Sequence, residues 1–207
     1  MQTTVAVLAL VASLFLLGTV ALYLYYLITG EKVTPNPATF LIRSIVSIIN
    51  VALYFQVADG SWLKTVVTVV SAAGLVGIFL YSCFKRKFSP VRILEVFCFI
   101  FAMGIVVIWW TMNDKVLANL LLQGVMLLAF WPQVNALYTN VGKELPLPWA
   151  LATTAYVLMT LVVLGSPSGW AWPQLVHPIA VGILGNGALM VLAFRQNNWT
   201  LASFRIK

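Results

Sequence analysis

The sequence predicts an all-α membrane protein with seven transmembrane helices, in a 3+1+3 arrangement of two parallel triple-helix bundles. Three observations lead to this prediction: the composition, seven long apolar segments and an internal repeat. Hydrophobic residues make up 62% of the 207 residues, charged residues make up only 8%, and the mean hydropathy is +0.99. A soluble domain is about half apolar and a quarter charged. The bilayer is therefore expected to be the main solvent for this chain.

Seven apolar segments have about the 20-residue length that a bilayer span requires. The segments are apolar all round, whereas the helices of a soluble protein carry a polar stripe. The first segment lacks the basic start of a signal peptide and is longer than its apolar region, so we expect a retained helix. The predicted helices are 3–29, 38–58, 62–84, 93–111, 116–139, 148–165 and 175–194.

Basic residues are distributed unequally between the two sides of the predicted membrane. One side receives ten of them: Lys32, Arg43, Lys85, Arg86, Lys87, Arg92, Lys143, Arg195, Arg205 and Lys207. The other side receives only Lys64 and Lys115. Because cytoplasmic loops are rich in lysine and arginine, we expect an outside N-terminus and a cytosolic C-terminus in a plasma (inner) membrane. The basic residues behind the net charge of +7 are therefore expected to orient the chain in the membrane, and no nucleic-acid partner is expected.

An internal repeat appears when the chain is shifted by 111 positions. The shift pairs identical residues at four places: Lys32 with Lys143, Pro35 with Pro146, Pro37 with Pro148, and Gly74 with Gly185. The expected organisation is a first bundle at 1–88, a linker helix at 89–114 and a second bundle with a short cytosolic tail at 115–207. Both bundles then start outside, which makes the repeat parallel. The alternative is chance, because proline favours helix starts in general.

Polar side chains at membrane depth are costly and need a partner or a water-filled cavity. Asn186 is the deepest and stands between two glycines, so it is expected either to line a pore or to join helices. Three polar or mixed stripes recur at helical spacing: Asn119, Gln123, Met126, Phe130 and Gln133 in the fifth segment, Ser44, Ser47 and Asn50 in the second, and Thr153, Tyr156 and Thr160 in the sixth. Each stripe indicates the bundle interior or a path through it.

Charged and titratable residues near the membrane receive individual interpretations. Arg43 lies about one turn into the second helix, where it either reaches back to the cytosolic interface or serves as a gate or anion-binding group. His177 is expected to be an interfacial residue at the outer edge rather than a proton relay. The carboxylates, Glu144 among them, fall in loops or near helix ends. Because none is expected near the midplane, facilitated diffusion is favoured over proton symport.

The end of the fifth helix carries the most specific motif, Phe130-Trp131-Pro132-Gln133, followed by a short basic loop and Pro148-Trp149. This motif resembles the PQ-loop, and with the 3+1+3 layout the chain resembles the SWEET and SemiSWEET sugar transporters of the MtN3-like superfamily. The resemblance implies alternating access, with substrate near the midplane and prolines as hinges. The substrate-binding candidates are Asn186, Trp131, Gln133, Tyr156, Gln123 and Asn50, and the hinge or gate candidates are Pro132, Pro35, Pro37, Pro146, Pro148 and Arg43.

The first repeat departs from the family pattern. Ala21 and Leu22 stand where the second repeat has Pro-Gln, and Leu75 stands where it has Asn186. Gly18 or Gly30 is the better hinge candidate in that half, since neither residue of the motif is present there. The two bundles are therefore expected to move unequally, and the binding pocket is expected to be asymmetric.

The expected function is a facilitator that moves a small neutral polar solute, with a sugar as the leading candidate. No arrangement typical of an enzyme, a metal site or a cofactor site is found, and Cys83 and Cys98 are expected to be core residues. Two alternatives stay open: a PnuC-type carrier of nicotinamide riboside, and a non-transporting PQ-loop receptor. The expected partners are a small-molecule substrate and the lipid bilayer, and a homo-oligomer stays open.

Overall fold

The computed structural model describes residues 2–29, 37–84, 93–140 and 144–197 of the chain. Every regular element within these ranges is helical, so the prediction of an all-α fold is confirmed for them. Pro35 lies outside the described residues, as do Gly30 and most of the basic residues used for the topology prediction. The bounds of the elements are α1 Gln2–Thr29, α2 Pro37–Val57, α3 Trp62–Phe84, α4 Ile93–Met112, α5 Lys115–Tyr138, α6 Pro146–Leu164, α7 Trp172–Val176, η1 His177–Gly185 and α8 Asn186–Gln196.

The last three elements follow one another without a break as a single helix, Trp172–Gln196. The ends of the helices lie within three residues of the predicted ones, because both turn signals and the required span length fix them. Within the described ranges, six helices are long and apolar enough to cross a membrane, and a seventh apolar stretch, Val96–Met112, is shorter. The prediction of a multi-pass membrane protein is confirmed at this level.

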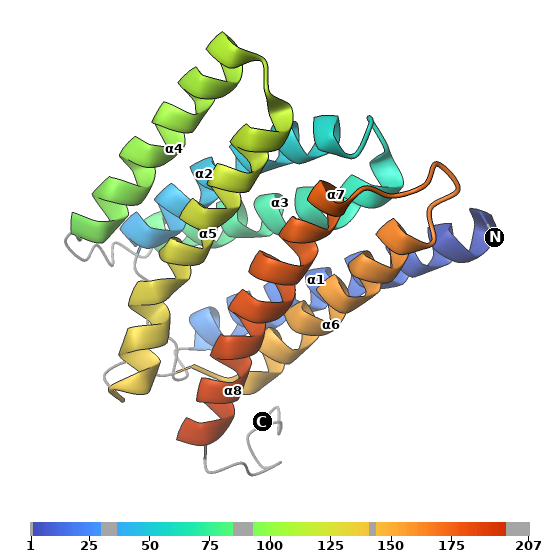
Figure 1. Ribbon diagram of the computed structural model, residues 1–207. Coiled ribbons are helices and arrows are strands. Elements are labelled where there is room, and N and C mark those ends of the chain that lie inside the picture. The colour runs from blue at the N-terminus through green and yellow to red at the C-terminus, as the bar shows by residue number, and fades with distance from the viewer. Residues whose placement is uncertain (1, 30–36, 85–92, 141–143, 198–207) are drawn as a thin grey trace.

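Six of the helices are arranged as a ring (Figure 1). Helix α3 packs against both α1 and α2, and the helix formed by α7, η1 and α8 packs against both α5 and α6. The ring closes because α1 lies along α6 and α2 lies along α5. Helix α4 packs outside this ring against α5 and α2.

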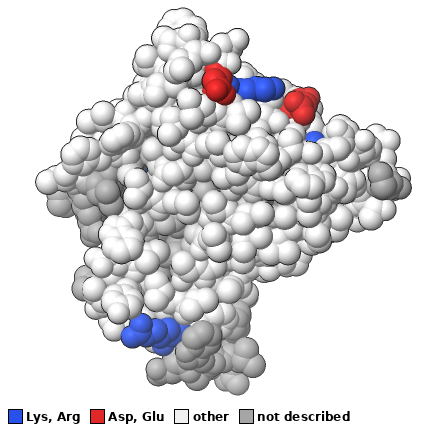
Figure 2. Space-filling view, viewed as in Figure 1, with Lys and Arg blue, Asp and Glu red and all other residues white. Residues whose placement is uncertain are grey.

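The surface matches a bilayer environment. Large apolar side chains face outward along most helices, for example Leu14, Phe101 and Leu184, which are 57%, 61% and 62% exposed. On the face in Figure 2, charged side chains gather at two opposite ends, and the wide surface between them is uncharged. This distribution leaves apolar side chains where hydrocarbon would contact the protein.

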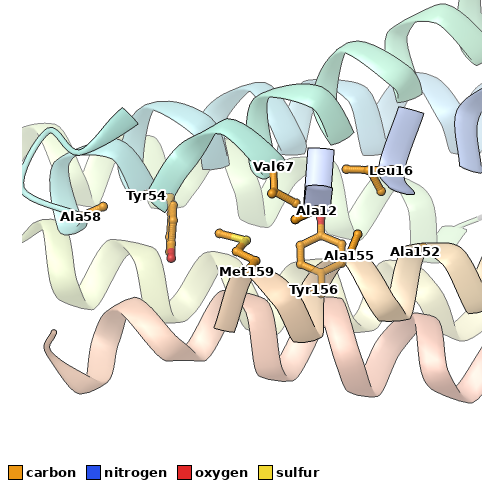
Figure 3. Packing of buried hydrophobic residues seen from close by; sticks show 9 residues of the cluster. All are labelled: Ala12, Leu16, Tyr54, Ala58, Val67, Ala152, Ala155, Tyr156 and Met159. Atoms are coloured by element: carbon orange, nitrogen blue, oxygen red, sulfur yellow. The ribbon is translucent and has the colours of Figure 1, made fainter. Parts of the chain in front are cut away.

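Small residues set the close contact between α1 and α6. Ala9 and Ala12 on α1 and Ala152 and Ala155 on α6 are all at most 3% exposed. Small side chains let membrane helices approach closely, since the hydrophobic effect does not drive helices together in lipid. In Figure 3, Ala12 and Leu16 of α1 lie next to the α6 residues of the same cluster. This contact forms one wall of the ring.

The helix Trp172–Gln196 departs from regular α geometry over the nine residues of η1, which are π-helical. Such segments are rare and are found frequently at functional sites. Pro178, near the start of η1, has no N–H to donate to the carbonyl of Gln174, four residues earlier. A Cβ atom on Gly182, one turn further along, would overlap the ring of Tyr156. The glycine therefore allows Tyr156 of α6 to lie directly against the helix.

Candidate functional site

A cavity lies inside the ring, lined by side chains from α1, α2, α3, α5, α6 and the last helix. Its volume, counted as the space open to the centres of water molecules, is about 80 Å³. A single water needs roughly 10–15 Å³ on such a measure, so several waters or a small solute fit. Aromatic rings line much of it: Tyr23, Phe40, Phe130, Trp149 and Tyr156. Polar groups are interspersed among them: Thr19, Arg43, Ser47, Ser71 and Asn186.

Asn186 presents an amide to this cavity from the first residue of α8. Its Nδ2 donates to the carbonyl oxygen of Gly182 at 2.9 Å, which fixes the side chain along its own helix. No hydrogen-bond partner of its Oδ1 is found in the described part of the chain. A Cβ atom on the preceding Gly185 would lie 3.0 Å from the ring of Phe130, so the glycine lets α5 approach. The arrangement leaves an acceptor oxygen next to aromatic rings.

At the end of the cavity near the α5–α6 loop, Arg43, Gln133 and Glu144 form a chain. Arg43 Nη1 donates to Gln133 Oε1 at 3.1 Å, and Gln133 Nε2 donates to Glu144 Oε1 at 2.8 Å. The guanidinium of Arg43 also lies over the ring of Phe130, 4.5 Å from its centroid. An arginine at membrane depth is costly unless it is partnered. Here the amide, the ring and the nearby carboxylate stabilise it together.

Glu144 receives further donors from two other helices. Trp149 Nε1 donates to its Oε2 at 3.3 Å, and the hydroxyl of Tyr23 donates to its Oε1 at 3.4 Å. Burial raises the pKa of Glu144 to about 7, although these hydrogen bonds, that from Gln133 and the charge of Arg43 act in the opposite direction. We call Tyr23, Arg43, Gln133, Glu144 and Trp149 the Glu144 cluster. It joins α1, α2, α5 and α6 at one end of the cavity.

A second polar group is buried further along α5. Gln123 Nε2 donates to Asn50 Oδ1 at 2.7 Å and to Asn119 Oδ1 at 2.9 Å, and His177 Nδ1 lies 2.8 Å from Gln123 Oε1. Because Gln123 Oε1 can only accept, this short contact favours a proton on His177 Nδ1, whereas the longer 3.4 Å contact of Nδ1 with Asn50 Nδ2 would require the opposite tautomer. Asn119 Nδ2 and His177 Nε2 are buried without a hydrogen-bond partner. We call these four residues the His177 cluster; it lies between α2, α5 and the last helix.

At the opposite end of the ring, Lys64 of α3 is completely buried. Its Nζ donates to the carbonyl oxygen of Gly169 at 2.7 Å and to Gln174 Oε1 at 3.0 Å. Gln174 Nε2 in turn donates to the Val57 carbonyl at 3.0 Å and to Asp59 Oδ2 at 3.2 Å. These contacts, the Lys64 cluster, join the α6–α7 loop to α2 and α3.

The predicted site residues are placed in three groups. Asn186, Tyr156 and Arg43 line the cavity, and Gln133 lies beside it in the Glu144 cluster. Gln123 and Asn50 lie in the His177 cluster and do not line the cavity. Trp131 is 60% exposed and is not among the lining residues, so the structure does not bring it to the other candidates.

The candidate hinge prolines in the described ranges lie at the start of a helix or, for Pro132, inside one. Pro37 is the first residue of α2, and Pro146 and Pro148 are in the first turn of α6, where a missing N–H costs nothing. The Pro148 carbonyl accepts from the hydroxyl of Thr19 at 3.2 Å, across the contact between α1 and α6. Pro132 lies inside α5, which continues past it to Tyr138.

One expectation about a titratable group needs correction. The last helix begins at Trp172, earlier than expected, so His177 is buried and hydrogen-bonded rather than interfacial. Lys64, which was counted on the outer side only for the topology, has a buried side chain. Sequence reasoning also missed Tyr23 and Trp149, and it treated Glu144 as a loop residue. A signal for Glu144 was present: it stands two residues before Pro146, the first residue of α6, in the loop that follows the helix with the Pro-Gln motif.

The fold and the cavity define a multi-pass, all-α membrane protein with a polar and aromatic interior. In the described ranges, no group of three His, Cys, Asp or Glu residues is placed to hold a metal ion. Comparisons with protein-family models, with curated proteins and with solved structures find no match for the chain. The function is therefore inferred from the geometry of the molecule itself.

Proposed function

We propose that the protein is a carrier that moves a small polar solute across the membrane by alternating access, as a facilitator without proton symport. The observation that carries this proposal is the cavity inside the six-helix ring, with the Glu144 cluster at one end of the cavity and the Lys64 cluster further along, at the opposite end of the ring. Each cluster consists of hydrogen bonds between helices, which can open and close, and neither is a continuous apolar core. A carrier needs such separable contacts on both sides of its binding site.

We further propose that the ring consists of two equivalent trios, α1–α3 and α5 to α8, with α4 as the linker. Gly74 of α3 packs against Val20 of α1, and Gly185, 111 positions later, packs against Phe130 of α5. Leu75 and Asn186, also separated by 111 positions, both line the cavity. The contact of α1 with α6 and that of α5 with α2 are likewise equivalent under this exchange. These correspondences support the SWEET-like 3+1+3 layout.

For the orientation, we propose an outside N-terminus and a cytosolic C-terminus, on the basis of the unequal distribution of basic residues. The Glu144 cluster then lies at the cytosolic end of the cavity, because it adjoins the α5–α6 loop. The Lys64 cluster lies at the outer end, next to the α6–α7 loop.

Among solutes, a sugar is the leading proposal. Aromatic planes such as Tyr156 and Trp149 suit the apolar faces of a sugar ring, while Asn186 and Ser47 can bind its hydroxyl groups. Nicotinamide riboside is the second candidate, because the same rings can stack on its base and the same polar groups can bind its ribose. A purely structural protein would have no need of a polar cavity between its helices, whereas the receptor alternative would bind a ligand there without flux.

The test is uptake into proteoliposomes that contain the purified protein, with radiolabelled glucose, sucrose and nicotinamide riboside in separate experiments. We expect saturable flux of one of them that stops at equal concentrations inside and outside. Flux no greater than that of protein-free liposomes with all three would overturn the proposed solutes and favour the receptor alternative. Each uptake is repeated with an inward proton gradient. Accumulation above equilibrium under that gradient would overturn the facilitator proposal.

A further inference from the structure

Glu144 precedes the first turn of α6, and its carboxyl group lies at one end of the cavity, in contact with residues that line it. It accepts hydrogen bonds from Tyr23 of α1, Gln133 of α5 and Trp149 of α6. Its backbone carbonyl also accepts from Asn197 Nδ2 at 3.2 Å, at the end of α8. One residue thus holds four helices together at the cytosolic end. Any movement that separates these helices must release the carboxyl group and expose it to water.

The charge on Glu144 is balanced only indirectly. In the described ranges, the ion pair within 4.0 Å is Lys115 with Asp59, at 3.7 Å, and Glu144 takes part in none. Arg43 reaches Glu144 through Gln133, whose oxygen accepts from the guanidinium and whose nitrogen donates to the carboxylate. Because Arg43 can only donate, the Gln133 amide must present its oxygen to Arg43 and its nitrogen to Glu144. A carboxyl group held this way has no direct counter-ion, so binding a proton is the remaining way to neutralise it.

The groups that face Glu144 can be stated for each element packed against it. Helix α1 contributes Tyr23 and helix α2 contributes Arg43, while α5, α6 and α8 contribute the uncharged Gln133, Trp149 and Asn197. Burial is the largest influence on the carboxyl group, and it raises the pKa of Glu144 to about 7. An exposed glutamate has a pKa of about 4.3. The closed cluster therefore binds a proton more tightly than an open, hydrated one.

We propose that Glu144 is a proton-binding site that controls the cytosolic opening of the cavity: the closed cluster holds the proton, and opening releases it to the cytosol. The proton returns to the side from which it came, so the carrier responds to cytosolic pH without carrying protons across the membrane. The direction follows from linkage, because the state with the higher proton affinity is favoured at low pH. Acid thus favours the closed end, and neutral to alkaline pH favours the open end. The assignment of this end as cytosolic rests on the proposed function.

The expected change of the open-to-closed ratio with pH follows from the proton affinities of Glu144 in the closed and in the open state. For a group that binds its proton near pH 7 when closed and near pH 4.5 when open, raising the pH from about 6 to about 8 increases the open-to-closed ratio about tenfold. A neutral amide at this position imitates the protonated acid at every pH. The variant Glu144→Gln should therefore behave like the wild-type protein at low pH and lose its pH dependence.

The test is the reaction of a cysteine in the cavity with a membrane-impermeant maleimide. Cys83 and Cys98 are first replaced by serine and alanine, and Ser47→Cys then supplies the reporter, since Ser47 lines the cavity and is only 3% exposed. Because thiolate fraction rises with pH, every rate is divided by that of a Thr139→Cys reporter, which is exposed at the same end. In lipid nanodiscs the corrected rate is expected to rise about tenfold between pH 6 and pH 8.

Glu144→Gln is expected to keep the corrected rate at the low-pH level throughout. Asp114→Asn is the matched control, because Asp114 is exposed and asparagine caps a helix equally well. This control should keep the tenfold rise. A rise that persists in Glu144→Gln, or a fall with pH in the unmodified protein, would overturn the proposal.

A direct measurement covers the case in which Glu144→Gln fails to elute as a folded protein. The infrared C=O stretch of a protonated carboxyl group, recorded against pH, should disappear with a midpoint near pH 7. If every carboxyl signal disappears with a midpoint below about pH 5 as the pH is raised, Glu144 does not hold a proton near neutral pH and the proposal is wrong. Neither readout needs a transported solute. Proton-linked accessibility without flux would therefore count against the proposed solutes alone, and flux with a flat accessibility profile would refute this inference alone.

Discussion

The hydroxyl of Tyr54 on α2 donates a hydrogen bond to the backbone carbonyl of Gln174 on α7, at 2.8 Å. In α-helical geometry this carbonyl would accept from the N–H of residue 178, but that residue is Pro178 and has none. A carbonyl that loses its α-helical donor cannot turn to water in a bilayer, and the Tyr54 hydroxyl supplies a donor from another helix. The proline that accompanies the π-helical segment is thus linked to α2, and the irregular helix is stabilised by the ring around it.

Replacing Tyr54 with phenylalanine removes this donor and keeps the ring that lies 5.3 Å from that of His177. We expect Tyr54→Phe to lower the free energy of unfolding by about 1–2 kcal/mol, because the Gln174 carbonyl loses its donor from α2. The change in the free energy of unfolding is measured by unfolding the variant and the unmodified protein in mixed detergent micelles. Tyr138→Phe is the control, since Tyr138 is 62% exposed. Equal stability of the two variants would contradict the role assigned to the Tyr54 hydroxyl.

Gly182 offers a second test of the packing around η1. An alanine there would bring its Cβ into the ring of Tyr156, so α6 and the last helix must separate. We expect Gly182→Ala to lower the free energy of unfolding by about 1–3 kcal/mol. Gly77→Ala is the comparison, because no atom lies within 4 Å of its added Cβ and alanine favours helix over glycine. A thermal melt in which Gly182→Ala matches or exceeds Gly77→Ala would show that the close approach is not required.

The helices were predictable because the bilayer fixes their length and turn residues fix their ends. The start of the last helix was the largest deviation: a Pro-Gln pair, Pro173 and Gln174, follows Trp172 directly, and proline is favoured in a first helical turn. Starting the helix at Trp172 moves His177 more than a turn inside it. That shift explains why a residue expected at the interface is buried.

Side-chain direction within the site was harder to predict than helix position. Phe130 faces the cavity and Trp131 does not, because successive residues of a helix point about 100° apart. The stripe through Gln123 and Phe130 already contained this information, but the resemblance to the PQ-loop favoured Trp131. Glu144 could not be assigned in this way. It lies outside regular structure, so only its partners on other helices determine where it points.

Trp131 therefore supplies a prediction that opposes the resemblance. If it bound substrate, Trp131→Ala would abolish flux. Since its side chain is 60% exposed and away from the cavity lining, we expect the initial rate of uptake to stay within about twofold of the unmodified protein. The measurement is uptake of whichever solute the proteoliposome screen identifies, at equal amounts of reconstituted protein. A loss of more than tenfold would restore Trp131 to the binding site.

Lys64 is predicted to hold the α6–α7 loop against α3. Lys64→Met keeps the length of the side chain but removes the donor to Gly169 and Gln174. Chymotrypsin cleavage after the exposed Trp170 in this loop should become about 5- to 30-fold faster, which corresponds to a loss of about 1–2 kcal/mol in local stability. Lys115→Met is the control, since the side chain of Lys115 is 45% exposed. Equal cleavage rates in both variants would show that the buried lysine does not restrain the loop.

Asn186 is the residue for which sequence and structure agree most directly, and its substitution tests the cavity as a binding site. Its Nδ2 is occupied by the carbonyl of Gly182, which leaves the amide oxygen to accept from a solute hydroxyl. Loss of one such hydrogen bond is worth about 1.4 kcal/mol, so Asn186→Ala should weaken the apparent affinity for the solute about tenfold. Leu184→Ala, on the lipid-facing side two residues earlier and 62% exposed, should leave it unchanged. Concentration-dependent uptake by the two variants, at matched protein content, measures the difference. If Asn186→Ala transports with unaltered affinity, the solute does not contact this amide, and the binding site must lie elsewhere along the path.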